Sequence, residues 1–201
     1  VDAPVVLGVR NLATRGVRDV SFDLKKGEIL GFAGLIGSGR TAVAEAIVGL
    51  AHRTGGEVTL DGKPVNFTQV AQSVDAGLAY MTKDRKGKGL LLNMGLRPNL
   101  TLLTLDKHLK AGFLDSSSED RALERAVRRF DIRARDASVA VGRLSGGNQQ
   151  KLMLGKTMES EPDIIIMDEP TRGNDVGTKQ QIYHIIAALA AEGQSFTLIT
   201  T

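Results

Sequence analysis

One glycine-rich segment constrains the fold of this chain more than any other part of it. Residues 34–41 read Gly-Leu-Ile-Gly-Ser-Gly-Arg-Thr, after a short apolar run at 28–33 and before helical spacing of Val43 and Ile47. The segment fits the pattern G-x-x-x-x-G-K-[ST], except that Arg40 stands where lysine is expected. Glycines let backbone N–H groups turn towards an anion, and the next helix presents its positive end. The segment predicts a strand–loop–helix unit that binds phosphate; a ligand-free glycine turn is the alternative.

A second apolar run ends in two carboxylates. Residues 164–167 are followed by Asp168 and Glu169, as when a buried parallel strand delivers polar residues at its carboxyl edge. There, Asp168 can hold Mg²⁺ through water, the hydroxyl of Thr41 can join it, and Glu169 can polarise a water that attacks phosphate. Alone, the run could equally be a core strand before a charged turn. Combined with the glycine-rich loop, it favours the catalytic interpretation.

A third segment reads Leu-Ser-Gly-Gly-Asn-Gln-Gln-Lys at residues 144–151 and precedes a helical pattern. The hydroxyl of Ser145 and the backbone N–H groups of Gly146 and Gly147 stand at the start of that helix, where an anion is favoured. The alternative is an ordinary capped helix start after a loop. The segment therefore predicts a second anion site.

The rest of the chain alternates between strand and helix patterns. The dipeptide Asp61-Gly62 predicts a hairpin between 57–60 and 63–65. Between 96 and 147 the pattern becomes helical, with Pro98 interrupting one segment and Ser116 with Glu119 forming a possible capping box. Strands then alternate with helices, which indicates an α/β fold with a parallel sheet. We expect one domain: a nucleotide-binding core with a β subdomain in 1–95 and 148–201, and a helical subdomain in 96–147.

Composition excludes several classes of protein. Hydrophobic residues make up 42% and charged residues 24% of the 201 residues, which is typical of a globular domain, and no apolar run reaches membrane-spanning length. Basic and acidic residues are interspersed, with a net charge of +3 and few aromatics, so a nucleic-acid partner is not expected. The absence of cysteine fits a reducing cytoplasm. The chain begins with Val1 and ends within an apolar run, so we expect a fragment of a longer protein.

The order of the three segments resembles the ATP-binding cassette family along essentially the whole chain. The spelling LSGGNQQK and the run at 168–177 are similar in particular to the second cassette of bacterial monosaccharide importers for ribose, galactose, arabinose and xylose, which usually carries arginine in the phosphate loop. The resemblance implies a P-loop NTPase (RecA-like) parallel-sheet core with an N-terminal antiparallel β subdomain and an inserted α-helical subdomain. It also implies ATP and Mg²⁺ as cofactors.

The same resemblance assigns roles to residues and implies partners. Glu169 orients the attacking water, and Thr41 and Asp168 hold the metal. The expected nucleotide contacts are Gly34, Leu35, Ile36, Gly37, Ser38, Gly39, Arg40 and Thr41 for the domain's own ATP, and Ser145, Gly146, Gly147 and Gln149 for the ATP of a partner cassette. The expected partners are a second cassette, transmembrane permease subunits and, indirectly, a periplasmic sugar-binding protein. ATP hydrolysis at the cytoplasmic face of the membrane would drive sugar uptake.

Several departures from the family pattern bear on hydrolysis. The stretch 80–86 lacks the glutamine that most cassettes place there; Lys83 or Asp84 could substitute for it, or both could be solvated loop charges. No aromatic residue lies in 12–17 to stack on adenine, and the expected switch histidine lies beyond Thr201. We therefore expect weak or absent hydrolysis by the isolated chain. One alternative is a degenerate cassette that binds nucleotide structurally and supplies its LSGGNQ signature to a competent partner. Another is a soluble relative in DNA repair or translation, which usually carries long insertions absent here.

Overall fold

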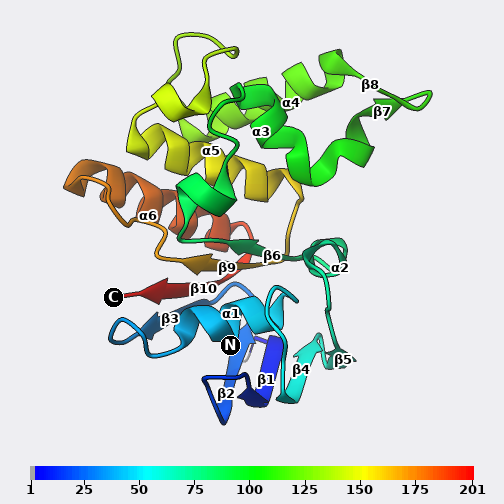
Figure 1. Ribbon diagram of the computed structural model, residues 1–201, viewed down its shortest axis with the longest axis vertical. Coiled ribbons are helices and arrows are strands. Elements are labelled where there is room, and N and C mark those ends of the chain that lie inside the picture. Colours follow the sequence, from blue (N-terminus) through cyan, green and yellow to red (C-terminus); the bar gives the residue numbers. More distant parts are fainter. Residues whose placement is uncertain (1–2) are drawn as a thin grey trace. The chain divides into compact units, whose positions relative to one another are not determined.

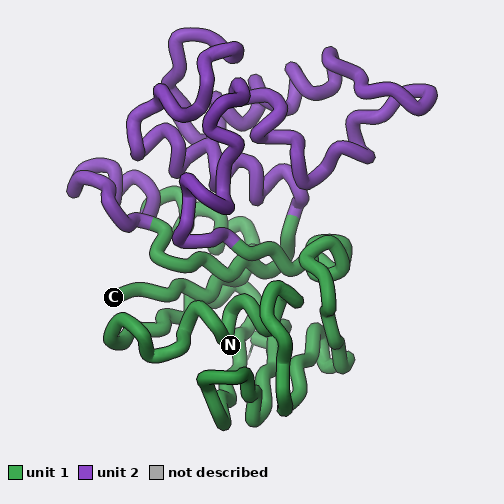
Figure 2. Tube along the Cα trace, viewed as in Figure 1, with its two compact units in different colours: residues 1–80, 162–170, 184–201 green, residues 81–161, 171–183 purple. Residues whose placement is uncertain are grey.

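The computed structural model describes residues 3–201, which form two compact units (Figure 2). Unit 1 comprises residues 3–80, 162–170 and 184–201, and unit 2 comprises residues 81–161 and 171–183. The phosphate-loop segment and the acidic strand end therefore belong to unit 1, whereas the signature segment belongs to unit 2. No helix within residues 3–201 has the length and apolar character needed to cross a lipid bilayer.

The first sheet of unit 1 is antiparallel, with the strand order β2-β1-β4-β5 (Figure 1). The hairpin predicted from Asp61-Gly62 is present between β4 and β5, and both turn residues have positive φ angles, 47° and 75°. This is the twist that two-residue hairpin turns require. The strands are β1 (Val5–Ala13), β2 (Val20–Lys25), β4 (Gly55–Leu60) and β5 (Lys63–Val65).

The second sheet has the order β3-β10-β9-β6, and β10 pairs in parallel with both β3 and β9 (Figure 1). All five residues of β9 are buried, as expected of a strand inside a parallel sheet. β6 was not predicted, because four residues are too few to show a period. The strands are β3 (Ile29–Ala33), β6 (Leu78–Met81), β9 (Ile164–Asp168) and β10 (Ser195–Thr200), and the helices that connect them include α1 (Arg40–Ile47), α2 (Val70–Asp75) and α6 (Val176–Ala191).

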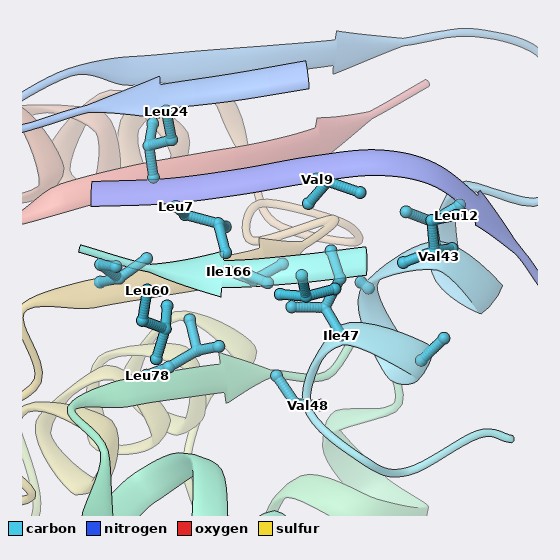
Figure 3. Packing of buried hydrophobic residues seen from close by; sticks show 14 of the residues in the cluster. Leu7, Val9, Leu12, Leu24, Val43, Ile47, Val48, Leu60, Leu78 and Ile166 are labelled. Carbon is cyan, nitrogen blue, oxygen red and sulfur yellow. The ribbon is translucent and has the colours of Figure 1, made fainter. Parts of the chain in front are cut away.

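One hydrophobic cluster joins the two sheets of unit 1. Figure 3 shows Leu7 and Val9 of β1, Ile47 of α1 and Ile166 of β9 together in this cluster. Each of these four side chains is at most 3% exposed. Because α1 contributes to the same cluster, the loop that precedes α1 is attached to a rigid base.

Unit 2 is mainly helical, and α5 is its central helix. Residues 149–158 of α5 are all buried, because α3 and α4 pack against it. A Cβ at Gly155 would lie 3.3 Å from side-chain atoms of Leu100 and Phe130, so these helices approach α5 closely at its glycine. The elements are a π-helical turn (Arg85–Gly89), α3 (Leu96–Thr101), η2 (Leu102–His108), β7 (Leu109–Lys110), β8 (Phe113–Leu114), α4 (Ser116–Phe130), η3 (Val141–Arg143) and α5 (Gly146–Glu159).

Two local expectations for this region differ from the structure. Pro98 lies in the first turn of α3, where its missing N–H leaves no intrahelical hydrogen bond unmade, so it helps to begin a helix. The compact helical unit extends from Met81 through α5 and does not stop at residue 147. The reason is that the apolar contacts of α5 are made with α3 and α4, which sequence spacing alone does not reveal.

The N-cap of α4 is Asp115, and the capping box expected from Ser116 and Glu119 does not form. Oδ1 of Asp115 accepts hydrogen bonds from the backbone N–H groups of Ser117 (3.0 Å) and Ser118 (3.3 Å). These bonds, with one from the Ser117 hydroxyl as the largest cause, lower the pKa of the Asp115 carboxyl. Glu119 instead is buried and accepts a 2.7 Å hydrogen bond from the hydroxyl of Thr101.

We predict that Asp115→Ala lowers the urea concentration at the midpoint of unfolding, because two N–H groups at the helix start lose their acceptor. Ser116→Ala is the matched control and is expected to change the stability by less than about 0.5 kcal/mol. Urea unfolding followed by circular dichroism measures both. Equal losses in the two variants would contradict the assignment of Asp115 as the cap.

Candidate functional site

Residues 34–39 form an open loop between β3 and α1, and Arg40 and Thr41 begin α1. Gly37 and Gly39 have φ angles of 86° and 87°, which are strained for residues with a side chain. A Cβ at Gly39 would overlap with the side chain of Val17, so the loop also needs the space that glycine leaves. Leu35 and Ile36 point to solvent, with 85% and 87% of their surfaces exposed. The loop conformation therefore depends on its glycines, as the sequence predicted.

The N-terminus of α1 follows this loop directly. Among the described residues no side chain caps it, and no acidic residue lies in its first turn. The first N–H groups of a helix have no intrahelical acceptor, and the helix dipole makes them attractive to anions. The start of α1 and the open loop before it thus fit a phosphate group.

Arg40 folds back onto the protein. Its Nε donates to Ser38 Oγ (3.0 Å) and its Nη2 to the backbone oxygen of Leu35 (3.0 Å). Its Nη1 donates to the backbone oxygens of Phe32, at the end of β3, and of Thr200, at the end of β10. The guanidinium thereby ties the loop to two neighbouring strands. Arg40 can contact a phosphate only if its guanidinium breaks some of these hydrogen bonds to carbonyl oxygens.

Asp168 lies at the end of β9 and is 1% exposed. Its Oδ2 accepts hydrogen bonds from Thr41 Oγ1 (2.7 Å) and from the hydroxyl of Tyr80 (3.3 Å). Its Oδ1 is buried and has no hydrogen-bond partner among the described residues. The structure thus brings Thr41 and Asp168 together across 127 residues of sequence. Tyr80 was not predicted as a site residue, because it lies on β6, a strand that is too short to show a period in the sequence.

This arrangement fits Mg²⁺. A buried carboxylate oxygen without a partner and an adjacent hydroxyl are oxygen ligands of the kind Mg²⁺ prefers, and the ion usually completes its shell with phosphate and water. Residues 3–201 contain no group of three or more histidine or acidic side chains that could enclose a metal ion. The site therefore suits a metal that arrives with a phosphate ligand.

Glu169 follows β9 and has a strained backbone. Its φ angle is 50°, in the left-handed region that costs a side-chain-bearing residue about 1 kcal/mol or more. Its N–H donates to the backbone oxygen of Ile199 (2.9 Å), which fixes the turn at the end of the strand. Its side chain is half-buried. Strain of this kind is commonly retained where a side chain must point in a particular direction for function.

The signature segment of unit 2 begins α5, with Ser145 as the N-cap. The side chain of Ser145 is exposed, and Gly146 and Gly147 form the first turn. Gln149 is 4% exposed; its Nε2 donates to the backbone oxygens of Val141 (3.1 Å) and Leu144 (3.2 Å). The amide that we expected to contact a partner's nucleotide thus lies inside unit 2, where it braces the chain before the signature.

The loop at 82–86 also belongs to unit 2. Asp84 caps the π-helical turn, and its Oδ1 accepts a hydrogen bond from the N–H of Gly87 (2.9 Å). Arg85 donates from Nη1 to Oε1 of Gln150 (3.2 Å), and burial lowers the pKa of its guanidinium. Asp84 thus has a structural role in this loop.

The chain is similar to curated bacterial import proteins. It is 42% identical over 198 residues to a ribose import ATP-binding protein of Chromobacterium violaceum, with 98% of this chain and 39% of the relative aligned. It is 44% identical to a ribose import ATP-binding protein of Geobacillus kaustophilus, with 97% of this chain and 40% of the relative aligned. The chain thus spans about two fifths of the length of these relatives.

Solved structures with a similar fold are ATP-binding cassettes. One is a dimeric post-hydrolysis state bound to ADP and Pi, with a TM-score of 0.80, 21% identity, and 96% of this chain and 87% of that one covered. Another is a nucleotide-free cassette from an ABC transporter, with a TM-score of 0.79, 21% identity and coverages of 98% and 81%. These likenesses confirm the predicted fold. The ABC transporter family model matches residues 17–172, and the chain therefore belongs to the ABC transporter family.

Proposed function

We propose that this chain is the nucleotide-binding domain of a bacterial ABC importer and that it couples ATP binding and hydrolysis to sugar uptake. The observation that carries the proposal is the 2.7 Å hydrogen bond between Thr41 and Asp168, beside a phosphate-loop conformation and next to the strained Glu169. The names of the two relatives support ribose as the sugar. Membership of the family supports ATP as the nucleotide.

Each residue of the site has a role in this proposal. The backbone of 34–41 and the start of α1 bind the phosphates of ATP, and Thr41 with Asp168 would hold Mg²⁺. When bound, the metal would neutralise negative charge on the phosphates. Glu169 accepts a hydrogen bond from the attacking water and takes up its proton. Arg40 keeps the loop attached to β3 and β10 through its carbonyl contacts.

The proposed partners follow from the same family. We infer that a second cassette binds ATP jointly with this one, and that the signature at 144–151 faces the partner's nucleotide. The pair would act on transmembrane permease subunits at the cytoplasmic face of the membrane, supplied by a periplasmic sugar-binding protein. The length of the relatives, more than twice that of this chain, leaves room for a second cassette in one polypeptide.

The alternative of a degenerate cassette has less support. Such a domain would hold nucleotide only structurally and would lend its signature to a competent partner. Thr41 and Asp168 lie in contact, and Glu169 directly follows Asp168 in a strained turn, so the residues needed for hydrolysis are present. The features of the described residues that favour the loss of hydrolysis are Arg40, the missing glutamine in 80–86 and the missing aromatic residue in 12–17.

Nucleotide binding tests the first part of the proposal. We predict that the purified chain binds ATP in the presence of Mg²⁺ and that Gly39→Ala weakens this binding at least about tenfold, because the added Cβ distorts the loop. Gly16→Ala is the matched control, since a Cβ at Gly16 meets no atom within 4 Å. Isothermal titration calorimetry gives both affinities, and thermal unfolding shows whether each variant is folded.

A second variant avoids any folding defect in the loop. Thr41→Val keeps the shape of the side chain but removes the hydroxyl beside Asp168, so it should remove most of the Mg²⁺ dependence of ATP binding. Absence of ATP binding by the native chain, or a Mg²⁺ dependence unchanged in Thr41→Val, is the result that the proposal cannot accommodate.

Sugar uptake tests the second part. In cells that lack the complete protein, re-expression should restore uptake of labelled ribose, and the Glu169→Gln variant should not. Arg40→Ala and Ser145→Ala, introduced separately, distinguish the two roles of the domain. If only Ser145→Ala stops uptake, the signature-lending alternative is favoured over hydrolysis at this site.

A further inference from the structure

The side chain of Asn148 has only one possible orientation in this structure. Its Oδ1 accepts a 2.7 Å hydrogen bond from the backbone N–H of Arg133. A backbone N–H can only donate, so the atom that faces it must be the amide oxygen and not the nitrogen. The Nδ2 group of Asn148 is therefore directed to its other neighbour, Oγ of Ser145, at 3.0 Å.

The hydroxyl of Ser145 consequently receives two hydrogen bonds. One comes from Nδ2 of Asn148, and the other, at 3.4 Å, from the backbone N–H of the same residue. Neither donor can accept a hydrogen bond, and a serine oxygen has two acceptor positions and one hydrogen. Both acceptor positions are used, so the O–H hydrogen must point away from Asn148. Within residues 3–201 it meets no acceptor, and Ser145 is exposed.

We propose that Asn148 is a positioning residue, which fixes Ser145 as a hydrogen-bond donor towards a phosphate group bound at the start of α5. This inference rests on the proposed function, in which the signature faces a nucleotide. It gives Asn148 a role in orienting Ser145, which differs from the direct nucleotide contacts expected of Ser145, Gly146, Gly147 and Gln149. Without the Asn148 amide only the backbone N–H of residue 148 still donates to the hydroxyl, so one lone pair becomes free to face a phosphate oxygen, which it repels. Bonds that are already made in the free protein cost nothing to form on binding.

Asn148→Asp is the sharpest test, because it changes a single donor into an acceptor at constant shape. One carboxylate oxygen still accepts from the N–H of Arg133, so the anchor remains. The other now accepts a hydrogen bond from Ser145, and this bond turns the hydroxyl hydrogen inward and away from the ligand. In the complete transporter, we expect ATP turnover to fall about 10- to 100-fold, because a hydrogen bond to a charged group is lost and a charge is added.

A double-mutant cycle with Ser145→Ala separates two effects of Asn148→Asp: the changed orientation of the Ser145 hydroxyl and the added negative charge. The added charge of Asn148→Asp acts on the phosphate whether or not Ser145 is present, so that effect cancels in the cycle. Orientation of the hydroxyl acts only through Ser145. We expect Asn148→Asp to be at least about tenfold more damaging in the native background than in the Ser145→Ala background. If Asn148 acts only in folding, Asn148→Asp should lower ATP turnover by the same factor in the native and in the Ser145→Ala background.

The outcomes are distinguishable. If Ser145→Ala leaves turnover unchanged, the signature does not serve a nucleotide, and both the proposed function of this segment and the inference fail. If Ser145→Ala lowers turnover but the factors for Asn148→Asp are equal in the two backgrounds, the inference alone fails. Thermal unfolding of the same variants of this chain identifies any loss of stability, which would accompany a structural role.

Discussion

Replacing Glu169 with glutamine is expected to lower steady ATP hydrolysis by the assembled transporter at least about 100-fold, while ATP affinity stays within about threefold. Glutamine has the shape of glutamate but cannot accept a proton from the attacking water. Its uncharged amide still fits the half-buried position after β9. Steady-state turnover and equilibrium ATP binding, measured on the same preparation, check the two halves of the prediction.

The strained backbone of Glu169 offers a control for this result. Glu169→Gly removes the carboxylate as well, but it relieves the left-handed conformation at φ 50°. We therefore expect Glu169→Gly to abolish hydrolysis without lowering the midpoint of thermal unfolding. Turnover by Glu169→Gln close to the native rate would show that another group activates the water. Fast turnover by the isolated chain would contradict the weak activity expected from its departures from the family pattern.

Gly56→Ala is expected to cause the largest loss of stability among single-methyl additions to unit 1. Gly56 is the second residue of β4 and has a φ angle of 83°, and a Cβ there would overlap with the backbone oxygens of Asn11 and Arg10 in β1. The register of β1 and β4 shifts between Arg10 and Ala13, so the two backbones come close at this point. We expect the free energy of unfolding to fall by about 4 kcal/mol or more, because backbone atoms cannot move aside as a side chain can.

Gly62→Ala is the matched control for this variant. Gly62 also has a positive φ angle, 75°, but a Cβ there would meet no atom within 4 Å. We expect Gly62→Ala to lower the free energy of unfolding by only about 1 kcal/mol, which is the cost of the backbone conformation alone. Urea unfolding of both variants gives the difference. Equal losses would mean that β1 and β4 separate easily and that the close approach contributes little.

Much of the fold follows from local sequence rules. The strand–loop–helix unit at 34–41, the Asp61-Gly62 hairpin and the buried run that ends in Asp168 each contain their own signal within a few residues. Glycines with positive φ, a two-residue turn and a continuous apolar run are decided by short-range sterics and by burial. Short elements such as β6 and α2 carried too few residues to show a period, and they were not predicted.

Part of the candidate site was predicted, because some of its residues lie in segments that carry a local sequence signal. Thr41, Asp168 and Glu169 were predicted as a group from motif order, and the structure places Thr41 against Asp168. The contribution of Tyr80 could not be predicted, because its hydroxyl reaches Asp168 only through the strand order of the parallel sheet. The hydrogen bond that anchors Asn148 also comes from a distant residue, Arg133.

By itself, the sequence determined which strand carries the carboxylates and which family the chain resembles, and it predicted which segments bind phosphate, since each depends on residue types at fixed spacing. Only the tertiary structure decided where individual polar groups point. Arg40 donates to carbonyls of β3 and β10, and Gln149 turns into unit 2. The physical reason is that a polar side chain takes the nearest partners that remain unpaired, and those partners are supplied by segments brought together by folding.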